Sequence, residues 1–177
     1  MIDRYAVTYR VIEAEDYAAI EAMEEKYDFD DSFMAEELNE MFSRPDNDFV
    51  KYHGYVAEYE GEVIGYLIGF VPNMAMAARQ TVIVRVAVEE QYRRKGVGTN
   101  LIEIVIPTKI GHKANTEIAL EDYVVAAFLR SNGFTVIGVV DAEIEEDGEV
   151  VMEGYMILQN EKKEKMSLTN RLKWEAK

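Results

Sequence analysis

The feature that most constrains the fold is the run from residue 81 to residue 106. TVIVRVAV (81–88) is rich in β-branched residues and predicts a strand. Two closely spaced glycines, Gly96 and Gly98, come next, and NLIEIVI (100–106) has the apolar pattern of a helix. Pro107 lacks an amide hydrogen and clashes with the preceding turn, so it predicts a kink or an early end of this helix. The run therefore predicts a strand, a glycine turn and a helix in direct succession.

The glycine turn follows three consecutive cations, Arg93, Arg94 and Lys95, in a chain with 34 acidic and 19 basic residues. The start of a helix presents unpaired N–H groups and a partial positive charge, which together bind phosphate. Glycine at positions 96 and 98 allows positive φ values and close approach of a ligand. The turn therefore predicts a phosphate site, with a plain solvent-exposed turn as the alternative.

Several classes of protein are excluded or disfavoured. A P-loop requires Lys-Ser or Lys-Thr after the second glycine, and a dinucleotide fingerprint requires a glycine where Leu101 stands. A net charge of −15 opposes a broad nucleic-acid face. No apolar run approaches the ~18 residues of a membrane span, and the amino terminus lacks a signal core, which predicts a cytoplasmic protein. The chain has no cysteine and only two isolated histidines, so we expect no thiol nucleophile and no metal.

The rest of the chain predicts one α/β domain over residues 1–160 and a charged tail over 161–177. We expect strands at 7–12, two within 55–72 around a turn at 60–62, one at 116–120, and a final pair within 135–158 joined by an acidic connection at 141–149. We expect helices at 15–27, at 34–42 after a cap at 30–32, and at 122–134, the last stopped by Gly133. The predicted order is β-α-α-β-β-β-α-β-α-β-β.

The run V-x-V-x-x-x-Y-R-R-K-G-V-G at residues 86–98 resembles the signature of the GNAT superfamily of acyl-CoA-dependent N-acyltransferases. Its pyrophosphate loop has the pattern [RQ]-x-x-G-x-[GA] after the fourth strand, and residues 93–98 fill that pattern. The resemblance extends over about residues 7–158, because the predicted order of elements is also that of the family. It implies the GNAT fold, with a mixed central sheet of about seven strands and helices on both faces.

The resemblance also implies acetyl-CoA as the cofactor, although a longer acyl group stays open. Its pyrophosphate would bind the amides of residues 94–99, and its pantetheine arm would pair with the fourth strand where that strand splays from the fifth. Backbone donors there would polarise the thioester carbonyl. The implied cofactor-binding residues are Val86, Ala87, Val88, Arg93, Arg94, Lys95, Gly96, Val97, Gly98, Thr99 and Asp122. No metal, nucleic acid or membrane partner is implied, and a homodimer stays open.

Glu117 matches the position where members similar to the ribosomal-protein alanine N-acetyltransferases keep a glutamate base. Leu129 stands where many members carry the tyrosine that protonates the leaving thiolate, and Asp122 stands where they carry an asparagine. Leucine cannot donate a proton, so Tyr123, Tyr66 or solvent would have to take that role. The resemblance therefore predicts acetyl transfer to a primary amine by direct attack in a ternary complex, with a non-catalytic acyl-CoA-binding module and a nucleotide-binding regulator as alternatives.

Arg85 lies in an otherwise apolar strand, and its charge must reach water or a carboxylate. It pairs with Glu117, with an acidic group of the substrate, or with a residue at the rim of the cleft. The acceptor side offers an acidic and aromatic rim that suits a cationic amine, a peptide N-terminus or a lysine. This rim comprises Tyr27, Asp28, Asp30, the methionines of NMAM (73–76) and the acidic connection.

Overall fold

The computed structural model describes residues 6–27, 32–43, 49–73, 80–106, 112–120, 122–146 and 149–161, with the backbone alone at 141–146 and 149–153. Within these ranges a sheet has the order β1-β2-β3-β4-β5-β7-β6. Its strands are β1 (Thr8–Val11), β2 (Val50–Tyr59), β3 (Glu62–Pro72), β4 (Gln80–Val88), β5 (Lys113–Ala119), β6 (Thr135–Glu146) and β7 (Glu149–Glu161). The helices are α1 (Tyr17–Tyr27), α2 (Ala35–Ser43), α3 (Val97–Val105) and α4 (Tyr123–Ser131), with 3-10 turns at Ala14–Asp16 and Glu90–Tyr92. The predicted fold class and element order are confirmed.

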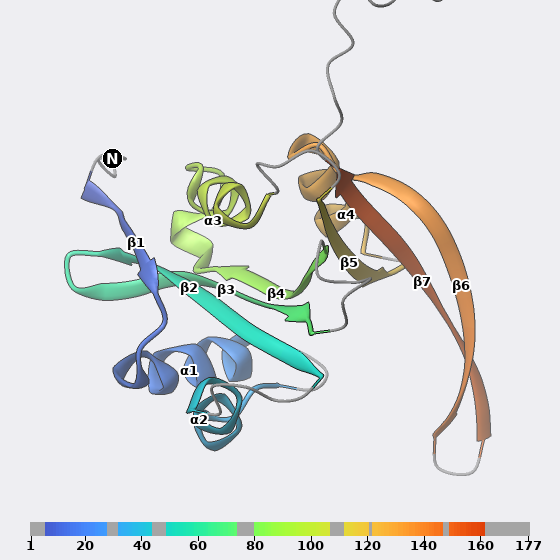
Figure 1. Cartoon of the computed structure of the whole chain (residues 1–177), viewed down its shortest axis with the longest axis horizontal. Helices are drawn as coiled ribbons and strands as arrows, with labels where there is room; N and C mark the ends of the chain where they lie inside the picture. Colours follow the sequence, from blue (N-terminus) through green and yellow to red (C-terminus); the bar gives the residue numbers. More distant parts are fainter. Residues whose placement is uncertain are drawn as a thin grey trace, which may run out of the picture.

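Helices cover the sheet on both faces (Figure 1), with α1 and α2 on one face and α3 and α4 on the other. The first face buries Ile20 and Leu38 against strand residues such as Tyr66. The second face buries Leu101 and Leu129 in a larger apolar core. Because side chains alternate along a strand, each of β2–β5 supplies residues to both faces.

The β2–β3 hairpin has the predicted turn. Glu60 and Gly61 both have positive φ values, 55° and 83°, as a two-residue type I′ turn requires. The pairing extends beyond the predicted strands, since β2 begins at Val50 and Lys51 pairs with Val71. The sequence pattern missed this end because Lys51 and His53 interrupt the apolar run, whereas the backbone ladder does not depend on side-chain polarity.

β4 bends in the middle and then separates from β5. On β3, Ile68 pairs with Arg85 and the next residue, Gly69, pairs with Ile83, so Val84 is the extra residue of a β-bulge. β4 and β5 are parallel and pair only over Gln80–Val82 and Lys113–Asn115. Beyond Val82 the described strands therefore part, as the family resemblance implies.

Two predicted segments have a different structure. α3 begins at Val97, three residues earlier than predicted, so Gly98 lies in the first helical turn rather than in the loop. The acidic segment after residue 140 is mostly strand, because β6 continues to Glu146 and pairs with β7. Its alternation of acidic residues with Ala142 and Ile144 has the period of a strand, which the prediction of an acidic connection overlooked.

The remaining predicted elements agree closely with the structure. β5 begins three residues before the predicted strand, α4 begins after Asp122, and Gly133 (φ 84°) follows the end of α4. Met34, where the second helix was predicted to begin, precedes α2 and is 49% exposed. The predicted cap residues 30 and 31 and the tail from residue 162 lie outside the described residues. No helix in the described ranges is long and apolar enough to cross a membrane.

Candidate active site

The open edge of β4 forms the first part of the site. The amide of Glu89 donates to the carbonyl of Ile64 on β3 at 2.9 Å. In an antiparallel pair the backbone N–H and C=O groups of successive residues point alternately toward the partner strand and away from it. Because the amide of Glu89 points toward β3, the N–H and C=O groups of Val88 and Val86 point away from β3. Ala87 is turned the other way, toward β3. Within the described strands no partner pairs with β4 beyond Val82 on this side, so the backbone of Val86 and the amide of Val88 offer an edge to an extended ligand, whereas the carbonyl of Val88 accepts from Arg93.

The start of α3 forms the second part of the site. Gly96 has a φ of 90° and precedes the helix, and the amide of Asn100 donates to its carbonyl at 3.0 Å as the first helical bond. The amides of Val97, Gly98 and Thr99 come before that bond and lie at the positive end of the helix dipole. This arrangement can bind the phosphates of a cofactor that runs along β4.

The two glycines of the loop have different physical roles. A Cβ on Gly96 would meet no atom within 4 Å, so this position requires glycine for its left-handed backbone and not for space. Gly98 lies in the helix, and a Cβ there would come within 3.1 Å of the ring of Phe128 on α4. Gly98 therefore permits close packing of α3 against α4, and positive φ is needed only at Gly96 of this pair.

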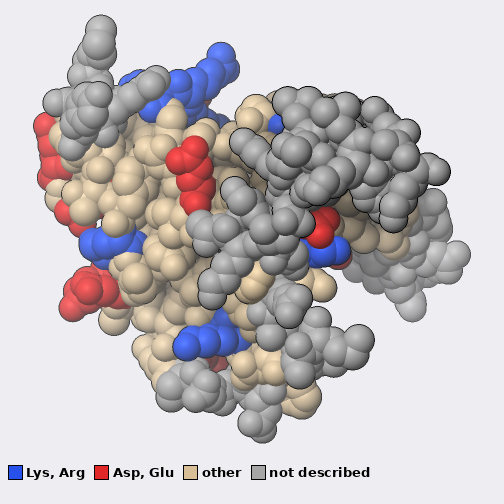
Figure 2. Space-filling model, turned by 45° about the horizontal axis from the view of Figure 1, so that its top comes forward, with Lys and Arg blue, Asp and Glu red and all other residues tan. Residues whose placement is uncertain are grey.

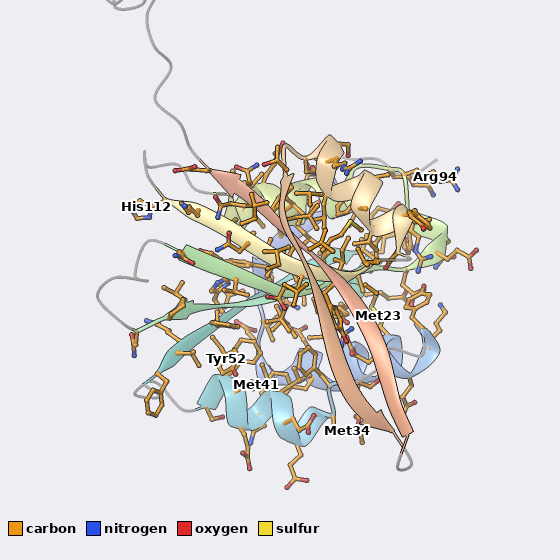
Figure 3. The ribbon with its side chains drawn as sticks, turned by 90° about the vertical axis from the view of Figure 1, so that its right-hand side faces the viewer. Met23, Met34, Met41, Tyr52, Arg94 and His112 are labelled. Atoms are coloured by element: carbon orange, nitrogen blue, oxygen red, sulfur yellow. The ribbon has the colours of Figure 1, made fainter. Side chains whose placement is uncertain are left out.

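The cations of the loop are held in three different ways. Arg93 donates through Nε to the carbonyl of Val88 at 2.8 Å. Lys95 donates to the carbonyl of Gln91 at 2.6 Å and lies over the ring of Tyr92. Arg94 has a positive φ of 58° and extends away from the sheet (Figure 3). All three lie at the loop predicted to bind pyrophosphate, where Arg93 and Arg94 are exposed and Lys95 is partly buried.

Tyr27, at the end of α1, joins the cofactor loop rather than the acceptor rim where it was predicted. Its hydroxyl donates to the Glu89 carboxylate at 2.9 Å and accepts from the amide of Glu90 at 2.8 Å. The guanidinium of Arg93 lies 4.5 Å from the centre of its ring. Lys26 also pairs with Glu89, and these hydrogen bonds outweigh burial and lower the pKa of that carboxyl. The end of α1 is therefore tied to the end of β4 by polar contacts.

Glu117 is exposed on β5 and lines a hollow of about 310 Å³ on the face opposite α3 and α4. Three side-chain amides cross the floor of this hollow. Asn115 donates to Gln80 on β4 at 3.1 Å and accepts from Gln159 on β7 at 2.8 Å. The apolar side chains of Ile137 and Ile157 complete the lining. The predicted base is thus accessible beside an ordered polar surface, which sequence reasoning did not identify.

Arg85 does not pair with Glu117, as one prediction had it. Its Nε lies 3.3 Å from a carboxylate oxygen of Glu24 on α1, and its guanidinium lies 5.5 Å from the centre of the Phe33 ring. Glu24 is fully buried and also accepts hydrogen bonds from the hydroxyl of Tyr66 and the amide of Phe33. Burial raises the pKa of Glu24, against the lowering effects of Phe33 and Arg85. The sequence signal for this cluster was an acidic residue on the apolar face of α1.

The side chains of α4 and β3 leave the proton donor unassigned. Leu129 is buried in the larger core, and Tyr66 is buried with its hydroxyl bound to Glu24, which removes it as a proton donor to a thiolate. Tyr123 is 76% exposed at the start of α4. Asp122 caps α4, since its carboxylate accepts from the amide of Val125 at 3.1 Å. Its predicted contact with the cofactor stays a prediction.

The histidines and the surface charges are the groups that a metal ion or a nucleic acid would bind. His53 on β2 is partly buried, and burial lowers its pKa. The described residues hold no cluster of three potential metal ligands. On the face in Figure 2 the described Lys and Arg side chains form separate groups among acidic and uncharged residues.

The split between β4 and β5, the open backbone edge of β4 and the amides at the start of α3 are features that suit an extended cofactor with phosphate groups. The sequence of residues 14–134 matches the acetyltransferase (GNAT) family. The chain therefore belongs to this family, and it is an acetyl-CoA-dependent acetyltransferase. Comparison with curated protein sequences gave no match.

Solved structures of acetyltransferases have the same fold. The ribosomal-protein-S18-alanine N-acetyltransferase from Escherichia coli is 16% identical, with a TM-score of 0.66 over 92% of this chain and 97% of that one. A ribosomal-protein-alanine N-acetyltransferase from Brucella melitensis is 19% identical, with a TM-score of 0.69 over 87% and 99%. A spermidine N-acetyltransferase chimera from Vibrio cholerae and hSSAT is 17% identical, with a TM-score of 0.65 over 88% and 95%.

Proposed function

We propose that this chain transfers the acetyl group of acetyl-CoA to a primary amine by direct attack in a ternary complex. The observation that carries this proposal is the continuity of the open β4 edge with the start of α3. Pantetheine would pair with the backbone of Val86 and Val88, and the pyrophosphate would bind the amides before Asn100. The thioester would then lie where β4 and β5 part, on the side where Glu117 is accessible.

Glu117 would act as the base in this reaction. A primary amine is protonated near neutral pH and must lose a proton before it attacks the thioester carbon. The carboxylate of Glu117 would accept that proton, directly or through a water molecule. The backbone N–H groups of the β4 edge would stabilise the developing oxyanion. A thiol with an ordinary pKa near 8.5 leaves as a thiolate without an obligatory acid, which is consistent with the buried Leu129.

The nature of the amine depends on residues outside the cofactor loop. The structural neighbours include proteins named for a ribosomal-protein alanine and for spermidine, so the shared fold accommodates different acceptors. Here the accessible carboxylate of Glu117 and, in a separate hollow, the carboxylates of Glu37 and Glu40 on α2 favour a cationic amine. A small amine, a peptide N-terminus and a lysine all fit this description.

The test is release of free thiol from acetyl-CoA with a panel of amines, amino acids and peptides. We expect transfer with at least one class of acceptor, and we expect Glu117→Gln to lower kcat/KM about 10²- to 10⁴-fold, the usual range for loss of a general base. Thermal stabilisation by acetyl-CoA should not change in this variant. Glu103→Gln, at an exposed position on α3, is the matched control and should retain activity.

One alternative function is favoured by a specific observation. Leu129 is buried where many family members carry a tyrosine that donates a proton, which suits a non-catalytic module that binds acyl-CoA. Such a module would be stabilised by acetyl-CoA but would release no thiol above the hydrolytic background with any acceptor. Stabilisation by ATP and not by coenzyme A would instead indicate a nucleotide-binding regulator.

A further inference from the structure

Arg85 and Glu117 lie on the same face of the sheet, on the two sides of the opening between β4 and β5. Arg85 faces α1, because its partners are Glu24 and Phe33. Glu117 lines the hollow on the face opposite the α3 and α4 core, which is the face that α1 and α2 cover farther along the sheet. Since the strands pair only as far as Val82, both residues lie just beyond the point of separation. The two side chains therefore flank one opening of the sheet, with the carboxylate in the hollow and the guanidinium beside α1.

The guanidinium of Arg85 is positioned by two groups outside β4. Glu24 on α1 faces its Nε, and its central carbon lies over the ring of Phe33, which precedes α2. Glu24 is itself held by the amide of Phe33 at 3.1 Å and by the hydroxyl of Tyr66. The Arg85 side chain still has 20% of its surface accessible. Arg85 is thus ordered before any ligand arrives, which lowers the entropic cost of binding one.

The contribution of the Arg85–Glu24 ion pair to the stability of the fold is a weak explanation for its presence. Replacing a buried ion pair with well-packed apolar residues is often neutral or stabilising, because desolvation of the charges offsets their attraction. An arginine held by a buried carboxylate is, however, well suited to recognition. Its planar fork binds a carboxylate through two parallel hydrogen bonds, a geometry that lysine cannot supply.

We propose that Arg85 binds a carboxylate of the acceptor, and that the acceptor is a small amino acid whose amine faces Glu117. This inference rests on the proposed function and specifies its substrate class. An amino acid is a zwitterion with no net charge, so the chain's charge of −15 would not repel it as it would a simple anion. Polyamines and alkylamines lack the carboxylate and would leave Arg85 without this contact.

The experiment compares acceptors that differ only in the carboxylate. Each amino acid is assayed beside its carboxamide and its decarboxylated amine, with thiol release from acetyl-CoA as the measurement. For the preferred amino acids we expect kcat/KM to exceed that of the matched carboxamide on the order of 10- to 100-fold, the size of a charge-assisted hydrogen bond. The difference should lie mainly in KM, because the contact between the carboxylate and Arg85 is the same in the ground state and in the transition state.

Variants then assign the preference to Arg85. The double variant Arg85→Met with Glu24→Gln removes the guanidinium without leaving a buried charge, and the ratio of acid to carboxamide should fall toward one. Arg85→Lys keeps the charge without the fork and should give an intermediate ratio. Arg130→Met, an exposed cation on α4, is the control and should keep the ratio of the unmodified chain. Thermal stabilisation by acetyl-CoA reports whether each variant is folded, and Arg85→Lys carries the test if the double variant is not.

The outcomes separate this inference from the proposed function. Thiol release that is equal or faster with carboxamides and simple amines would overturn the role of Arg85 and leave acetyl transfer intact. Equal losses for acid and carboxamide in the Arg85 variants would also overturn it, because a purely structural role affects both acceptors alike. Absence of thiol release with every acceptor would overturn both proposals.

Discussion

Tyr27→Phe tests whether the end of α1 holds the cofactor loop in place. The change removes the hydroxyl and keeps the ring on which Arg93 lies. Two hydrogen bonds are lost, one to the carboxylate of Glu89 and one from the amide of Glu90. A hydrogen bond contributes about 1 kcal/mol net, and one to a charged group about 1.5–3 kcal/mol. Glu89 keeps Lys26 as a partner, so we take the lower end of the range for each hydrogen bond. We therefore expect the free energy of unfolding to fall by about 2 kcal/mol.

That loss has two measurable consequences. For a domain of this size about 2 kcal/mol corresponds to a fall in Tm of about 4–8 °C. If acetyl-CoA requires the loop conformation seen here, its Kd rises by at most about 30-fold, since each 1.4 kcal/mol is a factor of ten. Thermal denaturation and calorimetric titration with acetyl-CoA give the two values.

Tyr52→Phe is the matched control for this prediction. Tyr52 lies on β2 with its ring against Phe70, away from the loop, and loses the same hydroxyl group. If Tyr27→Phe and Tyr52→Phe have the same stability and the same Kd for acetyl-CoA, the end of α1 does not position the loop and the reasoning is refuted.

Two further predictions concern backbone conformation and pH. Gly96→Val places a β-branched residue at a φ of 90° and should lower the free energy of unfolding by about 1–2 kcal/mol and abolish thermal stabilisation by acetyl-CoA. Gly61→Val, at a φ of 83° in the remote β2–β3 turn, should lower the free energy of unfolding by as much but keep the thermal stabilisation by acetyl-CoA. Equal responses to acetyl-CoA would argue against the loop. Burial raises the pKa of Glu24, so the folded chain binds this proton more tightly and the free energy of unfolding should fall as the pH rises above the ordinary value of 4.5. Glu24→Gln should remove that part of the slope in urea denaturation from about pH 5 to about pH 8, and an unchanged slope would contradict the assignment.

The elements that sequence predicted well are those with a strong local signal. The turn at Glu60 and Gly61, the β-branched run of β4 and the stop at Gly133 each depend on the conformational preferences of a few neighbouring residues. β6 was cut short because acidic residues were taken as a sign of a connection, although the alternation with Ala142 and Ile144 was present. α3 was begun too late because Gly98 was assigned to the turn, although glycine there serves packing against Phe128.

For the site too, the local structure was predicted from the sequence and the contacts between distant residues were not. The phosphate-binding turn is contained within a dozen consecutive residues, and its structure agrees with the prediction apart from the start of α3. Arg85 was recognised as a charge that needed a partner, but the partner on α1 is 61 positions away in the chain and had no local signal. Tyr27 was assigned to the acceptor side for the same reason, since its contacts are with residues more than 60 positions away.

The sequence by itself determined the backbone structure of the predicted cofactor site. A strand, a left-handed glycine and a helix start are set by local steric preferences, and so is the row of amides that they present to a phosphate. Only the tertiary structure decided which face Arg85 takes, what holds it, and how Glu117 lies across the opening of the sheet from it. These features arise from strand register, from the bulge at Val84 and from the packing of α1 on β4, which bring together residues that are distant in the chain.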